Sequence, residues 1–161
     1  MAEKTKKKTK IGILLCEKHC NKCHGLKCFR ALNDREGAFA AYKDTDLELV
    51  SYCSCTGCNA SAGNKIFAEW KKAGIELAFF STGFMCAYPP CPHLKYMRNL
   101  VEKAYGLKVV MGTHPIDSNF WASHNAVGSW NSEEWREAIK EVTTDEKTRQ
   151  AYTSFVKTPL D

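Results

Sequence analysis

The sequence predicts an α/β fold: a small doubly wound, mainly parallel four-stranded sheet in the order 2-1-3-4, with flanking helices and a C-terminal helical appendage. Apolar runs of strand length alternate with segments whose apolar residues recur at helical spacing, which is typical of parallel strands joined by helical crossovers. In addition, residues 70–75 and 102–107 both resemble the end of a helix, a glycine and the start of a strand, as in a repeated unit.

The first half of the chain contains two predicted strands. Residues 11–16 form a continuous apolar run, as expected for a central strand covered on both faces. A loop rich in cysteine and histidine is expected to follow over 16–28, and then a weak helical pattern over 29–42 that is interrupted at Gly37. The alternation of apolar and polar residues predicts a second strand over 47–53, and helical spacing predicts a helix over 60–73.

The second half supplies the other two predicted strands. Residues 75–81 form another apolar run, and an apolar stripe over 94–104 predicts the helix that crosses to a fourth strand over 107–112. Residues 119–130 are aromatic and polar without a period, which suggests a lid or a packing strap. Two further helices are expected, one beginning near Asn131 and one over 146–156.

Length and charge limit the classes of protein to which the chain can belong. At 161 residues the chain fits one domain, long enough to bury a core. Five lysines against one glutamate place +4 of the net charge of +5 in the first ten residues, so the body is close to neutral and argues against a nucleic-acid-binding module. We therefore expect a disordered lysine-rich tail over 1–10, an α/β domain over 11–115 and an extension over 116–161 packed on the same domain.

Cysteine content points to a reducing compartment. No apolar run is long enough to span a membrane or to act as an export signal, so a cytoplasmic location without membrane attachment is the expectation. Nine cysteines in such a compartment indicate metal ligands or redox thiols rather than a disulfide framework. The residue pattern specifies no partner protein and no oligomeric state.

Each predicted strand ends in residues that can bind a metal. The carboxyl ends of parallel strands meet at one edge of the sheet, where ligands bind in open α/β folds. In chain order, the four ends supply Cys16; Cys53, Cys55 and Cys58; Cys86, Cys91 and His93; and His114, and the thiols of Cys20 and Cys23 could join them. Helices that begin after Cys58 and at Pro92 are expected to lower the pKa of these thiols.

One ion cannot reach all four strand ends. In the predicted order the outer strands lie about 14 Å apart, because neighbouring strands are about 4.8 Å apart. Sulfurs around one zinc ion lie only about 4 Å from one another, given a bond of about 2.3 Å. The sequence therefore predicts either a polynuclear site, such as an iron–sulfur cluster, or two smaller sites.

Two alternative hypotheses assign a function to fewer of the cysteines. The Cys55-x-x-Cys58 pair, placed between a strand and a helix, also suits a thiol–disulfide oxidoreductase. The spacing Cys16-x3-Cys20-x2-Cys23 matches the cluster motif of radical S-adenosylmethionine enzymes, but the chain is short for their partial barrel and has Lys22 where an aromatic residue is usual.

Several of these elements together resemble the CGGC-domain family, which is described as metal-binding, with zinc suggested, and has no settled activity. The elements are an Ile-Gly-Ile strand that ends on cysteine, a Cys-x-Gly-Cys turn, a Pro-Cys-Pro-His segment and a strand that ends in Thr-His, all within residues 10–115. Thr56 departs from the family, which has a second glycine there, and Cys20 and Cys53 are additional to its pattern. The resemblance places the family's residues on Cys16, Cys23, Cys28, Cys55, Gly57, Cys58, Cys86, Cys91, His93 and His114.

The resemblance and the residue types together predict a metal-binding protein. The expected cofactor is a transition metal, held as an iron–sulfur cluster or as Zn²⁺ by thiolates and one or two histidines, with a preference for the cluster because it can use cysteines from separate loops. No acid, base or substrate pocket that would define an enzyme is evident in the sequence. The predicted metal ligands are Cys16, Cys23, Cys28, Cys55, Cys58, Cys86, Cys91, His93 and His114.

Overall fold

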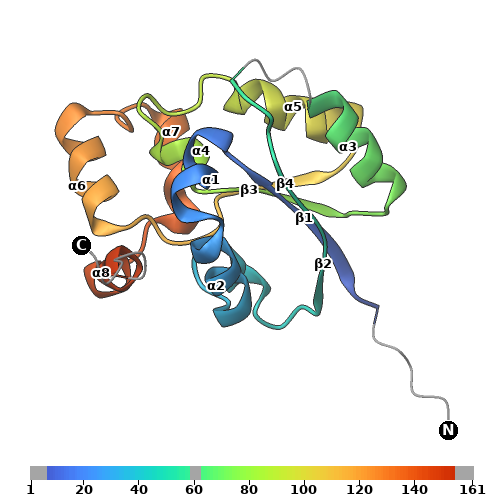
Figure 1. The fold of residues 1–161 in the computed structure, drawn as a ribbon, viewed down its shortest axis with the longest axis horizontal. Helices are drawn as coiled ribbons and strands as arrows, with labels where there is room; N and C mark the ends of the chain where they lie inside the picture. The colour runs from blue at the N-terminus through green and yellow to red at the C-terminus, as the bar shows by residue number, and fades with distance from the viewer. Residues whose placement is uncertain (1–6, 59–62, 155–161) are drawn as a thin grey trace, which may run out of the picture.

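The computed structural model describes residues 7–58 and 63–154, in which four strands form one parallel sheet. The central strands are apolar on both faces, and residues 11–15 and 77–80 are buried. The predicted strand order and parallel pairing are confirmed. In the order in which they lie across the sheet, the strands are β2 (Leu47–Ser54), β1 (Thr9–Leu15), β3 (Leu77–Phe80) and β4 (Lys108–Met111) (Figure 1).

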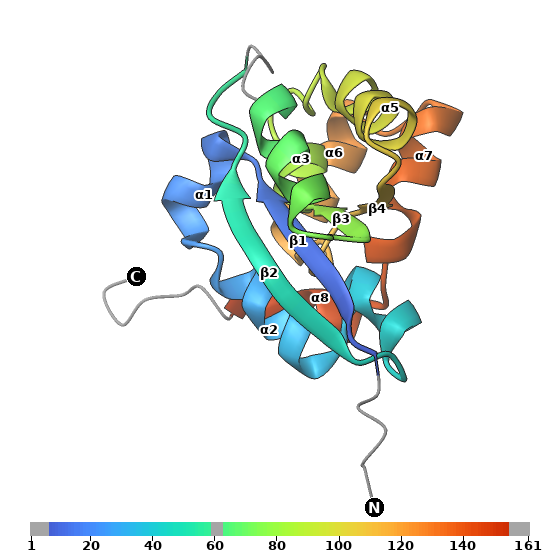
Figure 2. The ribbon, with the colours of Figure 1, turned by 90° about the vertical axis from the view of Figure 1, so that its right-hand side faces the viewer.

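Helices cover both faces of the sheet, as in a doubly wound fold (Figure 2). Phe80 of β3 packs on Phe67, with ring centroids 6.0 Å apart, whereas the preceding Phe79 stacks on Phe39 at 4.4 Å. Successive strand residues point to opposite faces, so these contacts place one helical layer on each side. The elements involved are α3 (Gly63–Lys72) and α5 (Leu94–Ala104) on one side, and α2 (Leu26–Asp34), the 3₁₀ helix η1 (Gly37–Tyr42) and α8 (Glu146–Ser154) on the other.

The packing of Trp70 explains why Gly12 of the first strand is a glycine. A Cβ atom on Gly12 would lie 2.9 Å from three atoms of the Trp70 indole, closer than real contacts allow. The indole Nε1 donates a hydrogen bond to Ser51 Oγ on the neighbouring strand at 2.8 Å. Gly12 therefore allows α3 to pack directly against the backbone of β1.

The prediction of a loop over 16–28 is wrong for most of that segment. Helix α1 (Glu17–Cys23) begins directly after β1, because the carbonyl of Cys16 accepts hydrogen bonds from the backbone amides of His19 and Cys20. His24 and Gly25, both with positive φ, then end α1 and lead into α2. The helix predicted over 29–42 with an interruption at Gly37 is divided close to that position, since Arg35 adopts a left-handed conformation between α2 and η1, which begins at Gly37.

The segment predicted as a lid or strap over 119–130 is mainly helix α6 (Ser118–Val127). Its buried residue is His124 rather than an aliphatic side chain, which explains why the sequence shows no apolar stripe. The predicted helix near Asn131 is confirmed as α7 (Glu133–Ile139), followed by a 3₁₀ turn η2 (Lys140–Val142), and the last helix is α8. None of the described helices is long and apolar enough to cross a membrane.

Residues after 115 share the core of the sheet domain. Ile116, Trp130, Val142 and Tyr152 are buried in the same hydrophobic cluster as the strands. Parts of the predicted segments lie outside the described residues: 1–6 of the lysine-rich tail, 60–62 of the helix predicted over 60–73, and 155–161 of the C-terminal extension, which include the end of its predicted last helix. The first strand begins at Thr9, two residues earlier than predicted.

Candidate metal centre

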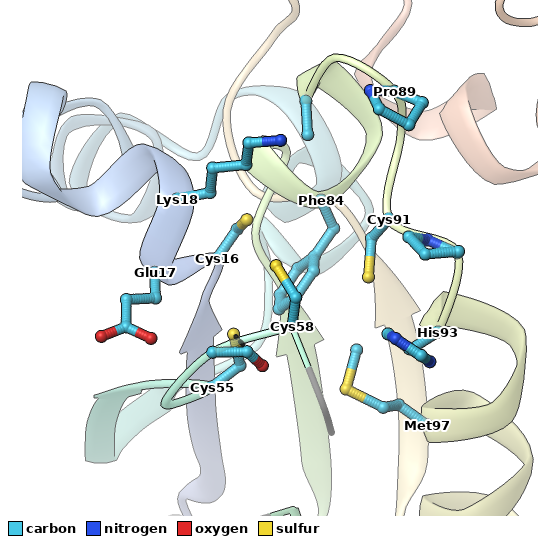
Figure 3. A pocket seen from close by; sticks show the side chains of 13 residues that line it. Cys16, Glu17, Lys18, Cys55, Cys58, Phe84, Pro89, Cys91, His93 and Met97 are labelled. Carbon is cyan, nitrogen blue, oxygen red and sulfur yellow. Dashed lines mark hydrogen bonds between the residues drawn. The ribbon is translucent and has the colours of Figure 1, made fainter. Parts of the chain in front are cut away.

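A cavity of about 500 Å³ lies at the carboxyl ends of the strands and is lined by four cysteines and a histidine. Figure 3 shows the four sulfur atoms around one space, with Phe84 and Met97 on its apolar wall. All four thiols are free of disulfides. The potential ligands of this cavity, called the thiol cavity below, are Cys16, Cys55, Cys58, Cys91 and His93.

Two of the cysteines are fixed to the sheet by their own backbone. Cys16 follows β1 directly, and its amide donates a hydrogen bond to Ser81 Oγ at 3.2 Å, beyond the end of β3. Cys55 follows β2, and its amide donates to the carbonyl of Leu15 at 2.9 Å. Both residues are buried, so their sulfurs have defined positions.

The other two cysteines come from loops. Cys58 is exposed and follows Thr56 and Gly57, which both have positive φ, at 59° and 114°. Cys91 is half-buried, and its amide donates to the carbonyl of Phe84 at 2.8 Å, which turns the loop back toward the sheet. The sheet therefore supplies two fixed thiols, and the loops bring two more accessible ones toward them.

Burial keeps two of these thiols protonated. Desolvation and, to a smaller extent, the neighbouring Cys55 thiol together raise the pKa of Cys16 to about 11, because burial disfavours a thiolate and two thiolates would repel each other. Burial also raises the pKa of Cys91. Backbone amides at the starts of the following helices lower the pKa of both thiols, as expected, but burial outweighs them and the net shift is upward. A metal would therefore have to displace their protons.

A second cavity, of about 310 Å³, shares Cys16 with the first. Burial raises the pKa of the Cys28 thiol to about 12, and Cys28 Sγ lies 3.1 Å from Thr113 Oγ1. Burial also raises the pKa of the enclosed Cys86 thiol. Besides these two cysteines, this second cavity is lined by Cys16, His19, Cys20, Cys23, Lys27, Ser81, His114, Asp117 and Phe120, among others.

His114 contributes a neutral ring to the second cavity. Its Nδ1 donates to the carbonyl of Pro115 at 2.7 Å, since a carbonyl can only accept, and its ring stacks on Tyr152 with centroids 5.7 Å apart. Desolvation lowers the pKa of His114 to about 4. The ring is therefore uncharged at neutral pH, with Nε2 unprotonated.

Two charged residues of the second cavity were not identified from the sequence. The Lys27 ammonium and the Asp117 carboxylate form a buried ion pair, with Nζ 2.7 Å from Oδ2. Lys27 stands on the face of α2 that also buries Cys28 and Ala31, and a lysine on an apolar helical face was the available signal. The pairing itself joins residues 90 positions apart and has no local signature.

The predicted ligands thus line two cavities, whereas the sequence left open whether they form one polynuclear site or two smaller sites. Four of the nine, Cys23, Cys28, Cys86 and His114, line only the second cavity, and Cys53 lines neither. Within residues 7–58 and 63–154, no three cysteine, histidine, aspartate or glutamate side chains are arranged to hold a single metal ion.

The fold and the thiol cavity together define a cysteine-rich, parallel α/β domain. The CGGC domain family matches residues 10–114, so the chain belongs to this family, for which metal binding has been suggested. The chain is also 30% identical over 115 residues to an uncharacterized protein of Methanocaldococcus jannaschii, an alignment that covers 66% of this chain and 88% of the relative. No solved structure matches the chain significantly.

Proposed function

We propose that the chain binds a transition-metal centre in the thiol cavity through Cys16, Cys55, Cys58 and Cys91, with His93 as a further ligand. The observation that carries the proposal is the gathering of four free thiols from three separate chain segments around one cavity (Figure 3). Thiolates and imidazole are the ligands that iron–sulfur clusters and zinc use in proteins.

The residue types fit a metal, and their placement favours a cluster. A single ion requires ligand atoms within about 4 Å of one another, and the described side chains form no such set. A cluster binds one cysteine at each of several irons, so it accepts sulfurs that lie further apart. We therefore propose an iron–sulfur cluster as the main form of the centre, with zinc as the alternative.

Burial of the cavity supports the same proposal. Phe84 and Met97 on its wall are buried, and such surroundings limit the access of water to a bound cluster. The nine free thiols further support a reducing compartment, for which we propose the cytoplasm. The proposed centre does not include Cys23, Cys28, Cys86 and His114, which line the second cavity instead.

A second candidate function is thiol–disulfide exchange by Cys55 and Cys58. The observation that favours it is the difference in exposure within the pair, since Cys58 is exposed and Cys55 is 9% exposed. An accessible attacking thiol beside a protected partner suits a redox dithiol. This function uses two of the four thiols in the cavity and leaves Cys16 and Cys91 without a role.

Anaerobic purification followed by metal analysis tests the proposal. A brown protein with iron and acid-labile sulfide in matching amounts is the expected result, and a colourless protein with bound zinc would select the alternative metal. Protein without metal, in which Cys55 and Cys58 form a reversible disulfide, would refute the metal proposal and support the redox function.

A further inference from the structure

The second cavity contains a buried ion pair that stability alone does not explain. Lys27 and Asp117 are 4% and 5% exposed, and removing two charges from water costs several kcal/mol per ion, which their attraction only partly offsets. Apolar residues of similar size are often as stabilising as such a pair. The position of the pair on the wall of a cavity therefore suggests a role in binding.

The Lys27 ammonium has more hydrogen-bond donors than partners among the described residues. A lysine ammonium carries three N–H donors. Among the described residues, the recorded partner of Lys27 is Asp117 Oδ2, at 2.7 Å. Two donors on the cavity wall therefore remain for a ligand.

The Asp117 carboxylate does not depend on Lys27 alone for its compensation. Its Oδ1 accepts hydrogen bonds from the backbone amides of Asn119 at 3.1 Å and Phe120 at 3.0 Å, at the N-terminus of α6. The partial positive charge of this ten-residue helix stabilises the carboxylate as well. Lys27 can consequently share its charge with a second carboxylate that enters the cavity.

Two neutral groups add to the polar surface of the cavity. His114 Nε2 is an acceptor, because Nδ1 holds the ring proton, and no described residue is recorded as its partner. The hydroxyl oxygen of Ser81 accepts from the Cys16 amide, which leaves its proton available to a ligand. Leu15 and Phe120 add apolar surface.

We propose that the second cavity binds a small carboxylic acid that carries a hydroxyl or amino group beside the carboxylate. The Lys27 ammonium pairs with the ligand carboxylate, and His114 Nε2 accepts a hydrogen bond from the neighbouring hydroxyl or amine. A cavity of about 310 Å³ is at the small end of ligand sites, which limits the ligand to a few carbon atoms beyond these groups. Because Cys16 lines both cavities, the bound acid lies next to the proposed metal centre, although its binding does not depend on that centre.

A titration with three matched probes tests this proposal. Lactate has both the carboxylate and the hydroxyl, propionate lacks the hydroxyl, and lactamide lacks the charge. We expect lactate to shift the amide NMR signals of Gly83 and Asn119, beside the second cavity, with a Kd of about 1 mM, and to bind more tightly than either of the other probes. Equal binding of lactamide, or no saturable shift with lactate in the millimolar range, would overturn the proposal.

Variants identify the residues that bind the acid. The double variant Lys27→Met/Asp117→Asn removes both charges, retains a side chain able to cap α6, and is expected to weaken lactate binding at least about tenfold. Lys27→Met alone is a poorer test because it leaves Asp117 buried without its partner. Lys18→Met is the matched control, since Lys18 lines only the thiol cavity, and it is expected to bind lactate like the native chain.

The outcome can be separated from that of the metal proposal. The titration is performed on the protein as purified and after treatment with a chelator, and lactate is expected to bind in both cases. Native affinity in the charge-free double variant, or loss of affinity in Lys18→Met, would contradict the assignment. Binding abolished whenever metal is present would also contradict it, because the metal would then occupy the second cavity.

Discussion

Replacement of Thr56 by glycine is expected to stabilise the protein. Thr56 lies between Cys55 and Cys58 with a φ of 59°, a left-handed conformation that costs a residue with a Cβ about 1–2 kcal/mol and suits a β-branched side chain least. Glycine removes this cost but loses about 0.5–1 kcal/mol more conformational entropy on folding. The Thr56 side chain is exposed and adds little packing, so the net gain should be about 0.5–1 kcal/mol.

Urea denaturation and thermal melting measure this difference. A gain of that size corresponds to a rise in Tm of about 1–4 °C for a chain of this length. Thr56→Ala is the control because it keeps the Cβ atom, and it should stay within about 0.5 kcal/mol of the native protein. Gly57→Ala, one residue further on at a φ of 114°, should destabilise. A Thr56→Gly variant no more stable than Thr56→Ala would refute the argument that this turn is strained.

Two further predictions concern the sheet and the second cavity. Gly12→Ala should lower the free energy of unfolding by about 1–3 kcal/mol, because the new methyl group meets the Trp70 ring at 2.9 Å. The double variant Gly12→Ala/Trp70→Leu should recover part of this loss, as measured by urea denaturation. His114 should make the free energy of unfolding depend on pH, because its pKa is about 4 in the folded state and 6.5 in the unfolded state. The stability that the neutral ring contributes is complete above pH 6.5 and is lost as the pH falls toward 4, by up to about 3 kcal/mol. His114→Asn should show a flatter stability profile over this range, and identical profiles would contradict the assignment.

The sheet could be predicted from the sequence because its signals are local. The buried runs that became β1 and β3, and the glycines between helix and strand, each depend on a few neighbouring residues. Helix α6 was missed for the same reason. Its buried side chain is His124 and its cap is Asp117, so the usual apolar periodicity was absent although the cap was present.

The position of the thiols could be predicted only in part. The rule that the ends of parallel strands share one edge of the sheet predicts that Cys16, Cys55 and Cys91 lie near one another, and all three line one cavity. Their division from Cys28 and Cys86 could not be predicted, because it depends on how α1 and α4 (Gly83–Cys86) pack beside the sheet. The ion pair of Lys27 with Asp117 likewise exists only once α2 and α6 meet.

The metal content of two cysteine variants tests the central proposal most directly. Cys58 is exposed, so Cys58→Ser removes one proposed ligand with little effect on the fold, and Cys53→Ser is the matched control because Cys53 lies outside both cavities. After anaerobic purification, iron, sulfide and zinc are measured for both variants and for the native chain. The proposal predicts that Cys58→Ser loses most of the bound metal while Cys53→Ser retains the native amount. Equal metal content in the two variants would contradict a metal centre in the thiol cavity.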